Sequence, residues 1–499
     1  MLPRLALLFF LFSGAFLFAE DPAAFRAHGI FSDRMVLQRD KEIVVAGFGG
    51  PAGTTVTAEL AGHQSSGQIT ATGWRVVLPP LPAGGPHRLV IEGPSRLVFE
   101  DVLVGDVWLA SGQSNMHMRL RAVPEYTAAP EKFTNPRVRF IRLGGRPTPA
   151  PSPDIERAKE FAGGWAEGST SQTKEISAVG WVFADRLQRE FDVPIGLIHA
   201  AHGATRNEAW MPEHAVRAVS PDEKILAKPT DAKNPWIFYN GLIAPLTAFP
   251  LKGFIWYQGE ANGHSPVRYE AALRGLIRSW REAWRDDALP FYFVQLPAYP
   301  FGMDRTGESW AWVREAQAKV AATEPFEDIH PLAKSEVGRR LAAVAIADLR
   351  GDRAQAEGPA LAGATFESGQ AVLTFANTRG GLLAKQVVMN RKKGLPPQAD
   401  PEALRAKDGV LTGFTVAGAD GKYHEAEAEI RGDQVIVRSA QVAKPASVRY
   451  GWANFTLANL ANAAGFFASP FRTDSAPMPD ALKQTPYWAR GQGTAAVAE

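Results

Sequence analysis

The chain has 499 residues, of which 45% are apolar and 21% charged, so it is globular rather than disordered and long enough for about three domains. It has 54 Lys and Arg against 52 Asp and Glu, and a net charge of +2 favours neither a nucleic-acid partner nor an anionic membrane surface. The chain has no cysteine, which excludes disulfides, thiolate catalysis and cysteine-based metal sites.

Residues 1–19 have the pattern of a signal peptide. Arg4 supplies a positive charge, Leu5–Phe18 is apolar, and Ala19 is a small residue at a cleavage position. The apolar run is short for a bilayer span, and an uncleaved amino-terminal anchor is the competing interpretation. No other stretch of the sequence is apolar enough to cross a membrane. We therefore expect a secreted or periplasmic protein without stable membrane insertion once the signal is removed.

The segment 24–101 has the pattern of an antiparallel β domain. Thr55–Leu60 alternates with a period of two, and short β-prone runs begin at Ile43, Arg75 and Arg88. Gly and Pro residues separate these runs. Short, evenly spaced strands with such breaks indicate a small sandwich or barrel.

Over residues 102–350 the pattern changes to strands that alternate with helices. Val102–Ala110 is almost continuously apolar, as expected for a strand buried on both faces. The further strand candidates are Arg137–Leu143, Val193–Ile198, Gly253–Tyr257 and Phe291–Leu296, and the helical stretches lie around Val182–Leu187, Leu273–Trp284, Trp310–Ala322 and Lys334–Ala347. This alternation predicts a parallel α/β sheet flanked by helices.

Strand patterns return in the segment 356–474, which we expect to form a second β domain. The runs are Ala371–Phe375, Gly413–Val416 and Gln434–Arg438. Residues 475–499 have weak periodicity and are expected to form a loose tail.

Four polar segments follow strand candidates of the middle region, where parallel sheets collect ligands and catalytic groups. The first, Ser111–Met116, places Ser114 on a strand-to-helix turn whose amides point toward developing charge. Taken alone, the motif fits a helix-capping serine better than a catalytic one, because serines are common at helix starts. The second, His202–Thr205, contains Gly203, which lets the backbone approach a ligand closely.

The third segment, Trp256–Asn262, carries three polar side chains. The amide of Asn262 can donate to an oxyanion without adding charge, and Gln258 and Glu260 can brace the loop. The fourth segment contains His330, the residue type that takes a serine proton and returns it to a leaving alcohol, and Asp328, which can orient the imidazole. Each of these segments alone is also compatible with an ordinary turn.

Together the motifs resemble those of the sialate O-acetylesterase family of SGNH hydrolases, which is related to carbohydrate acetylesterases. The resemblance extends over residues 28–474 and rests on the segments Phe31–Arg39, Gly105–Met116, Pro194–Ile198, Trp256–Asn262, Arg314–Gln317, Asp328–Pro331, Val337–Leu341, Val448–Trp452 and Pro470–Asp474. It implies a flavodoxin-like parallel sheet flanked by amino- and carboxy-terminal β-sandwich-like domains. It also implies a serine esterase, without metal or cofactor, that removes O-acetyl groups from sialic acids or polysaccharides.

The resemblance assigns a role to each site residue. Ser114 attacks the acetyl carbonyl, His330 acts as the base, and Asp328 orients it. The oxyanion is held by the Ser114 amide, a backbone amide at Gly203 or at its neighbour Ala204, and the Asn262 side chain. The substrate-side candidates are Gln113, Gln258 and Glu260.

Two departures from the family pattern bear on activity. His202-Gly-Ala-Thr205 stands where the family has Trp-Gly-Gly-Thr. Ala204 disfavours a positive φ. His202 can either contact the leaving side of the ester or fill a gap, and we expect it to fill a gap. Only residues 318–327 separate Gln317 from Asp328, which is too short for the family's usual buried strand. The alternative to an active esterase is therefore a weakened or inactive relative that only binds carbohydrate.

Overall fold

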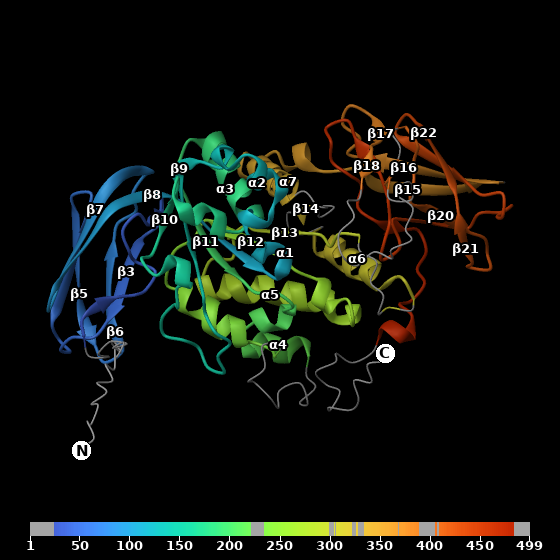
Figure 1. Ribbon diagram of the computed structural model, residues 1–499. Helices are drawn as coiled ribbons and strands as arrows, with labels where there is room; N and C mark the ends of the chain where they lie inside the picture. Colours follow the sequence, from blue (N-terminus) through green and yellow to red (C-terminus); the bar gives the residue numbers. More distant parts are fainter. Residues whose placement is uncertain are drawn as a thin grey trace, which may run out of the picture.

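The computed structural model describes residues 24–220, 234–298, 304, 306–321, 326–327, 334–367, 369–388, 405–406 and 409–483. It has a mixed α/β architecture, with one large sheet and several smaller sheets (Figure 1). The predicted signal segment, residues 1–19, lies outside the described residues. Within the described part of the chain, no helix is both long and apolar enough to cross a membrane.

The large sheet has 14 strands. Their bounds are β1 Arg26–Ala27, β2 Val36–Gln38, β3 Ile43–Phe48, β4 Thr55–Leu60, β5 His63–Thr70, β6 Gly73–Leu78, β7 Gly84–Glu92, β8 Arg96–Gly112, β9 Asn135–Arg142, β10 Ala166–Gly168, β11 Ile195–Ala201, β12 Gly253–Tyr257, β13 Phe291–Val294 and β14 Phe326–Glu327. The antiparallel part, in the order β1-β3-β6-β5-β4-β7-β8, contains all four strand candidates of the segment 24–101.

Strand β8 connects the two parts of the sheet. Its first half pairs antiparallel with β7, and its second half pairs parallel with β11 and β12. The boundary expected between residues 101 and 102 therefore falls inside one continuous strand. Asp101 has φ +55° within the part of β8 that pairs with β7, where the register of the two strands shifts.

The parallel part has the order β9-β11-β8-β12-β13-β14. Strand β14 bears on one expectation from the sequence. The short segment before Asp328 was expected to be unable to supply the family's usual buried strand, and it supplies a strand of only two residues, in which Phe326 and Glu327 pair in parallel with Phe293 and Val294. Two residues are enough because a parallel neighbour already provides the backbone partners. The edge strand is shortened, not lost.

Seven α-helices are described, and they cover both faces of the parallel strands. They are α1 Ser114–His117, α2 Pro124–Ala128, α3 Ala178–Phe191, α4 Glu213–Val219, α5 Tyr269–Trp284, α6 Ser309–Ala321 and α7 Lys334–Leu349. Helices α3 and α7 pack together on one face, and α4 and α5 lie on the other (Figure 1). The helices predicted from periodicity correspond to α3, α5, α6 and α7.

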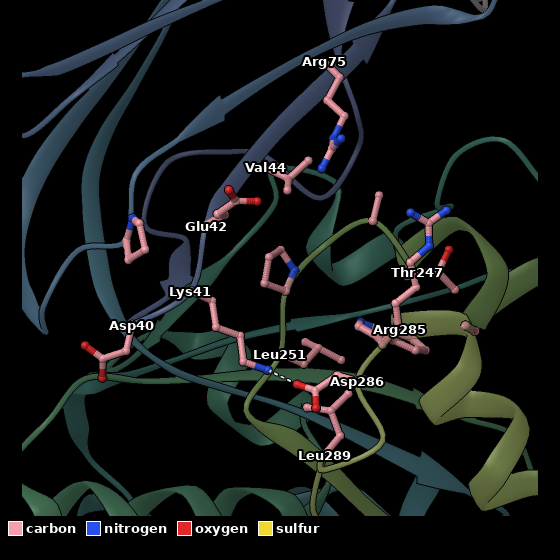
Figure 2. Close-up of a pocket in the computed structure, with 15 residues that line it drawn as sticks. Asp40, Lys41, Glu42, Val44, Arg75, Thr247, Leu251, Arg285, Asp286 and Leu289 are labelled. Carbon is pink, nitrogen blue, oxygen red and sulfur yellow. Dashed lines mark hydrogen bonds and ion pairs between the residues drawn. The ribbon is translucent and has the colours of Figure 1, made fainter.

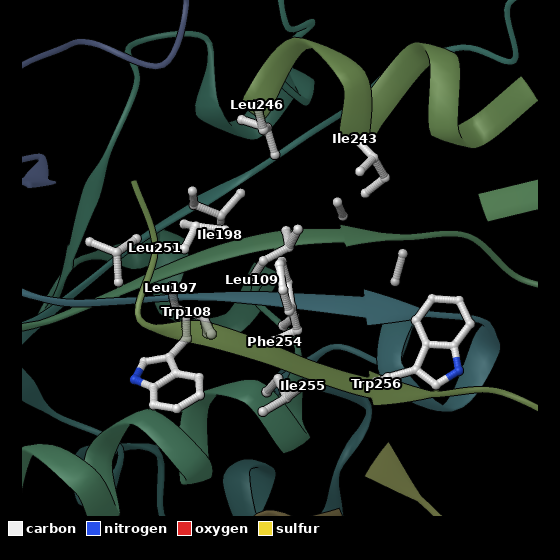
Figure 3. Packing of buried hydrophobic residues seen from close by; sticks show 14 of the residues in the cluster. Trp108, Leu109, Leu197, Ile198, Ile243, Leu246, Leu251, Phe254, Ile255 and Trp256 are labelled. Atoms are coloured by element: carbon white, nitrogen blue, oxygen red, sulfur yellow. The ribbon is translucent and has the colours of Figure 1, made fainter. Parts of the chain in front are cut away.

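The core lies between the parallel strands and these helices. Trp108 of β8 is buried on one face of the parallel strands. Leu109 of β8 is buried on the other face, together with Phe254 and Trp256 of β12 (Figure 3). The Trp108 ring stacks on Tyr292 with the ring centroids 5.6 Å apart. Each large side chain buried in this way contributes about 1.5–3 kcal/mol to stability.

The remaining strands form smaller sheets toward the carboxyl end. Two have four strands each, in the orders β15-β16-β23-β22 and β21-β20-β24-β26, and two have two strands each, β17-β25 and β18-β19. The bounds are β15 Ala360–Glu367, β16 Gln370–Ala376, β17 Leu382–Ala384, β18 Val387–Val388, β19 Arg405–Ala406, β20 Phe414–Ala417, β21 Tyr423–Glu425, β22 Glu427–Arg431, β23 Gln434–Arg438, β24 Ser447–Tyr450, β25 Leu460–Asn462 and β26 Phe471–Arg472.

Part of the segment expected to be a loose tail is packed. Leu482 lies in a short 3-10 turn and is 5% exposed, in a cluster with Trp312 and Trp452. The apolar side chain docks on the two indoles, which weak periodicity does not reveal. Residues 484–499 lie outside the described part of the chain.

Candidate active site

The carboxyl ends of five parallel strands lie in one row. Gly112 at the end of β8 is in register with Ala201 of β11 and with Tyr257 of β12. Tyr257 is in register with Val294 of β13, and Val294 with Glu327 of β14. The chain therefore leaves each strand at the same edge of the sheet, as the positions of the four polar segments predicted.

The predicted base and its partner, His330 and Asp328, lie outside the residues that the structure describes. The structure describes the chain before and after these two residues. Glu327 ends β14 at the row of strand ends, and Lys334 begins α7. The Lys334 ammonium donates a 2.6 Å hydrogen bond to the Asn115 side chain, next to the predicted nucleophile. The roles of His330 and Asp328 stay predictions.

The turn after β8 exposes the predicted nucleophile. Gly112 has φ +134°, and a Cβ at this position would lie 2.2 Å from the Tyr257 carbonyl oxygen, so glycine is required here. Helix α1 then begins at Ser114, whose side chain is exposed. Gln113, just before it, is buried, with 3% of its surface exposed.

Gln113 and Gln258 face the protein interior. The Gln113 side-chain oxygen accepts hydrogen bonds from the Gln258 amide at 3.2 Å and from the Ala261 backbone at 3.2 Å. Gln258 is fully buried and also receives a 2.8 Å hydrogen bond from the Tyr269 hydroxyl to its carbonyl. Both side chains brace the loop after β12 against the loop after β8, as was expected of Gln258. A substrate-side role for Gln113 and Gln258 stays a prediction.

The Asn262 side chain is held in one orientation. Its oxygen accepts from the Gln258 side chain at 2.7 Å and from the Asn207 backbone at 3.0 Å. Its nitrogen donates to Glu208 at 3.0 Å. An amide nitrogen carries two hydrogens, and the second has no acceptor among the described residues, so it can serve an oxyanion.

Gly203 lies beside Ser114. A Cβ placed on Gly203 would be 3.8 Å from Ser114 Cβ, an ordinary van der Waals contact. The next residue, Ala204, adopts φ +60°, the conformation that alanine was expected to disfavour. The backbone after β11 therefore approaches Ser114 closely, although Ala204 stands at the second glycine of the Trp-Gly-Gly-Thr pattern.

His202 is exposed and does not fill a gap, contrary to the expectation from the sequence. Its ring stacks on Phe238 with the centroids 4.6 Å apart, and Phe238 stacks on Trp210 at 5.1 Å. Because the aromatic pair beneath is already packed, the imidazole covers it from the solvent side.

The Glu260 carboxylate is turned into the protein. One oxygen accepts a hydrogen bond from the Asn115 side chain, and the other is buried with no partner among the described residues. Burial raises the pKa of Glu260, while the hydrogen bond from Asn115 and the charge of Lys334 oppose that rise. A bracing role therefore fits this carboxylate better than substrate contact.

Sequence reasoning missed a histidine pair next to Ser114. The Nδ1 atom of His117 lies 2.8 Å from the Ala201 carbonyl oxygen, and its ring centroid is 5.7 Å from that of His199. Burial lowers the pKa of both rings, so both are neutral at pH 7. His117 follows Ser114 by one helical turn, which was the available signal. His199 was hidden in an apolar strand.

A cavity of about 690 Å³ lies at the opposite edge of the sheet. It is lined by Leu251 and Leu289, which precede β12 and β13, and Lys41 forms a 2.7 Å ion pair with Asp286 there (Figure 2). Catalytic groups of a parallel sheet gather at the carboxyl ends, so this cavity is not the active site. In the described ranges, no three His, Asp or Glu residues are grouped as a metal site would require.

The chain is similar to one family model and to a protein of known structure. Residues 104–328 match a family model described as carbohydrate esterase, sialic acid-specific acetylesterase. The chain is 33% identical to a carbohydrate acetylesterase of known structure from Xanthomonas citri, with a TM-score of 0.78 over 91% of this chain and 100% of that one.

Mammalian relatives match about half of the chain. The sialate O-acetylesterase of Homo sapiens is 30% identical over 301 residues, covering 54% of this chain and 57% of that protein. The sialate O-acetylesterase of Mus musculus is 29% identical over 331 residues, covering 55% and 60%. The chain thus spans less than two thirds of the length of these curated relatives.

Proposed function

This chain belongs to the carbohydrate esterase family of sialic acid-specific acetylesterases, and we propose that it removes O-acetyl groups from sugars with Ser114 as nucleophile. The observation that carries the proposal is the meeting of Ser114, Gly203 and Asn262 at one edge of the sheet. Ser114 is exposed beside Gly203, and the loop that carries Asn262 is braced against the Ser114 turn.

In the proposed mechanism, the Ser114 hydroxyl attacks the acetyl carbonyl and transfers its proton to His330, which Asp328 orients. The sugar alcohol leaves with that proton, and an acetyl-enzyme remains. Water, deprotonated by the same His330, then releases acetate. Glu327 and Lys334, held at the sheet edge and against Asn115, anchor the chain on both sides of this pair and support the assignment.

The proposed oxyanion hole combines backbone and side-chain donors. The Ser114 amide lies at the start of α1, and the amide at Gly203 or Ala204 lies across from it. The free N–H of Asn262 completes the set, because Gln258, Asn207 and Glu208 fix its amide. Donors that are already oriented cost no reorganisation when charge develops on the oxygen.

The proposed substrate is an acetylated sugar, either an O-acetylated sialic acid or an acetylated polysaccharide. The family model and the relatives' names support this class of substrate. The non-catalytic alternative rested on the shortened segment before His330. The two-residue pairing of β14 with β13 supports the catalytic proposal, because it brings the chain before Asp328 to the same sheet edge as Ser114.

Three finer features belong to the same proposal. The parallel sheet is of the flavodoxin-like SGNH type and lies in residues 102–350. It is flanked by β domains in residues 24–101 and 356–474. Residues 1–19 direct export to the periplasm or the medium.

The proposal is tested by acetate release from O-acetylated sialic acid and from acetylated xylan. The wild-type chain is expected to release acetate from at least one of them, and Ser114→Ala to release none while remaining folded. A folded Ser114→Ala variant with wild-type turnover refutes the serine mechanism. A folded wild-type chain that is inert on both substrates refutes the acetylesterase assignment.

A further inference from the structure

A buried lysine contacts the turn that carries Ser114. Lys334 is 2% exposed, although lysine is among the residues least often buried. Its ammonium donates a 2.6 Å hydrogen bond to Asn115 Oδ1 and lies 5.0 Å from the centroid of the Tyr257 ring. An ammonium removed from water requires polar partners of this kind, so the contact is specific.

Asn115 also contacts the buried carboxylate of Glu260. Its Nδ2 group donates to Glu260 Oε1, while its Oδ1 accepts from Lys334. Only one orientation of the amide presents oxygen to the cation and nitrogen to the carboxylate. Because the two charges face opposite ends of the amide dipole, both hydrogen bonds are strengthened and a flip is penalised.

The Ser114 turn depends on such outside contacts. Helix α1 has four residues, and its N-cap residue Gln113 makes no side-chain capping hydrogen bond. So short a helix has little stability of its own. Gln113 is fixed on one side of Ser114 by the Gln258 amide and the Ala261 backbone, and Asn115 on the other by Lys334 and Glu260. The exposed serine thus lies between two fixed neighbours.

We propose that Lys334 is a positioning residue, which holds Asn115 against Glu260 and so fixes the Ser114 turn to the amino end of α7. The inference rests on the proposed role of Ser114 as nucleophile. Lys334 also follows the predicted base His330 by four residues in the sequence. One hydrogen bond therefore ties the nucleophile turn to the helix that follows the base.

A positioning residue affects turnover more than substrate binding, because it does not touch the substrate. Lys334→Met keeps the length of the side chain but removes the donor, and it is expected to lower kcat by about 10- to 100-fold with KM changed less than about twofold. Lys334→Arg keeps a cationic donor and is expected to recover part of the loss. The readout is 4-nitrophenyl acetate hydrolysis by the full chain.

A double-mutant cycle separates positioning from a general loss of stability. If Lys334 acts through Asn115, then Lys334→Met has no further effect on kcat once Asn115→Leu is present. The matched control is Lys41→Met, which removes an ion pair at the opposite sheet edge and is expected to leave kcat unchanged. Should Lys334→Met not fold, Lys334→Gln keeps an N–H donor without the charge and gives the same comparison against Asn115→Leu.

The outcomes distinguish this inference from the proposed function. Additive losses in kcat, or an unchanged kcat in folded Lys334→Met, overturn the positioning role while Ser114→Ala remains inactive. Wild-type turnover in Ser114→Ala overturns the proposed function itself. Non-additive losses with unchanged KM and partial recovery in Lys334→Arg are the expected result.

Discussion

Gly203 and Ser114 are neighbours across the ends of β11 and β8, close enough that a methyl group on Gly203 would lie 3.8 Å from Ser114 Cβ. The backbone that follows β11 thus lies next to the serine that is exposed after β8. An acyl oxygen bound at Ser114 would be within reach of the amides that follow β11, which is the requirement for an oxyanion hole.

This contact predicts unequal effects of two substitutions at Gly203. Gly203→Ala keeps the backbone amide, and its Cβ meets no atom closer than ordinary contact, so kcat should change less than about threefold. Gly203→Pro removes the amide and should lower kcat by about 100- to 1000-fold. Steady-state hydrolysis of 4-nitrophenyl acetate measures both. An active Gly203→Pro variant would exclude this amide and direct the same test to Ala204.

Ala204 is predicted to be a destabilising residue in the wild-type chain. The φ of +60° costs alanine roughly 1–2 kcal/mol, and glycine would relieve this strain. Glycine also makes the unfolded chain more flexible, which offsets about 0.4–1 kcal/mol of that gain. Ala204→Gly should therefore raise the free energy of unfolding by about 0.5–1 kcal/mol, measured by urea denaturation. The control Ala200→Gly, inside β11, should lower it. A loss of stability in Ala204→Gly would contradict the left-handed conformation.

His199 is predicted to make stability depend on pH. Burial lowers its pKa well below the value in the unfolded chain, so the unfolded state binds the proton more readily. Stability is then fully present above the unfolded pKa of about 6.5 and is lost as the pH falls below it. Between pH 7.5 and pH 5.5, the wild type should lose more free energy of unfolding than His199→Leu. A folded His199→Leu variant that loses as much free energy of unfolding as the wild type over this pH range would contradict the prediction.

Asp474 is predicted to tie the carboxy-terminal strands to α6. It accepts hydrogen bonds from Arg449 at 2.8 Å and from Arg472 at 3.0 Å, and these arginines also pair with Glu308 and Glu315 at the start and middle of α6. Although burial opposes ionisation, the hydrogen bonds from Arg449 and Tyr423 hold the pKa of Asp474 well below its usual range.

Asp474→Asn should lower the free energy of unfolding at pH 7 by about 2–3 kcal/mol, because two arginines lose their carboxylate. The lowered pKa gives a stabilisation that is present above the unfolded pKa of about 4 and is lost as the pH falls further, so the difference should shrink in acid. Asp480→Asn removes an ion pair with Lys483 that is open to solvent, and it should leave the free energy of unfolding nearly unchanged. Equal effects of the two substitutions would contradict the account.

The fold was predictable where apolar periodicity is strong. Thr55–Leu60 and Gly253–Tyr257 were expected as strands and are β4 and β12. Strand β5 was not predicted, because it is polar and only Ile69 in it is buried. Strand β14 escaped because two residues carry no periodicity, and their pairing is set by the neighbouring strand rather than by their own sequence.

The site was predictable in position but not in the direction of its side chains. Polar motifs after apolar strands located Ser114, Gly203 and Asn262 at one edge of the sheet. The sequence does not reveal that Gln113 points inward while Ser114 points outward, because that depends on Gly112 and on donors from another loop. Lys334 resembled an ordinary helix-start lysine, and only the fold brings it to Asn115.

The central claim is that Ser114 is the nucleophile of an esterase. The most direct test is to treat the wild-type chain with an organophosphonate and locate the adduct by peptide mass spectrometry. We predict one adduct per chain, on Ser114, formed together with complete loss of 4-nitrophenyl acetate hydrolysis and absent from Ser114→Ala. An intact, folded chain that hydrolyses the ester while Ser114 remains unlabelled would contradict the claim.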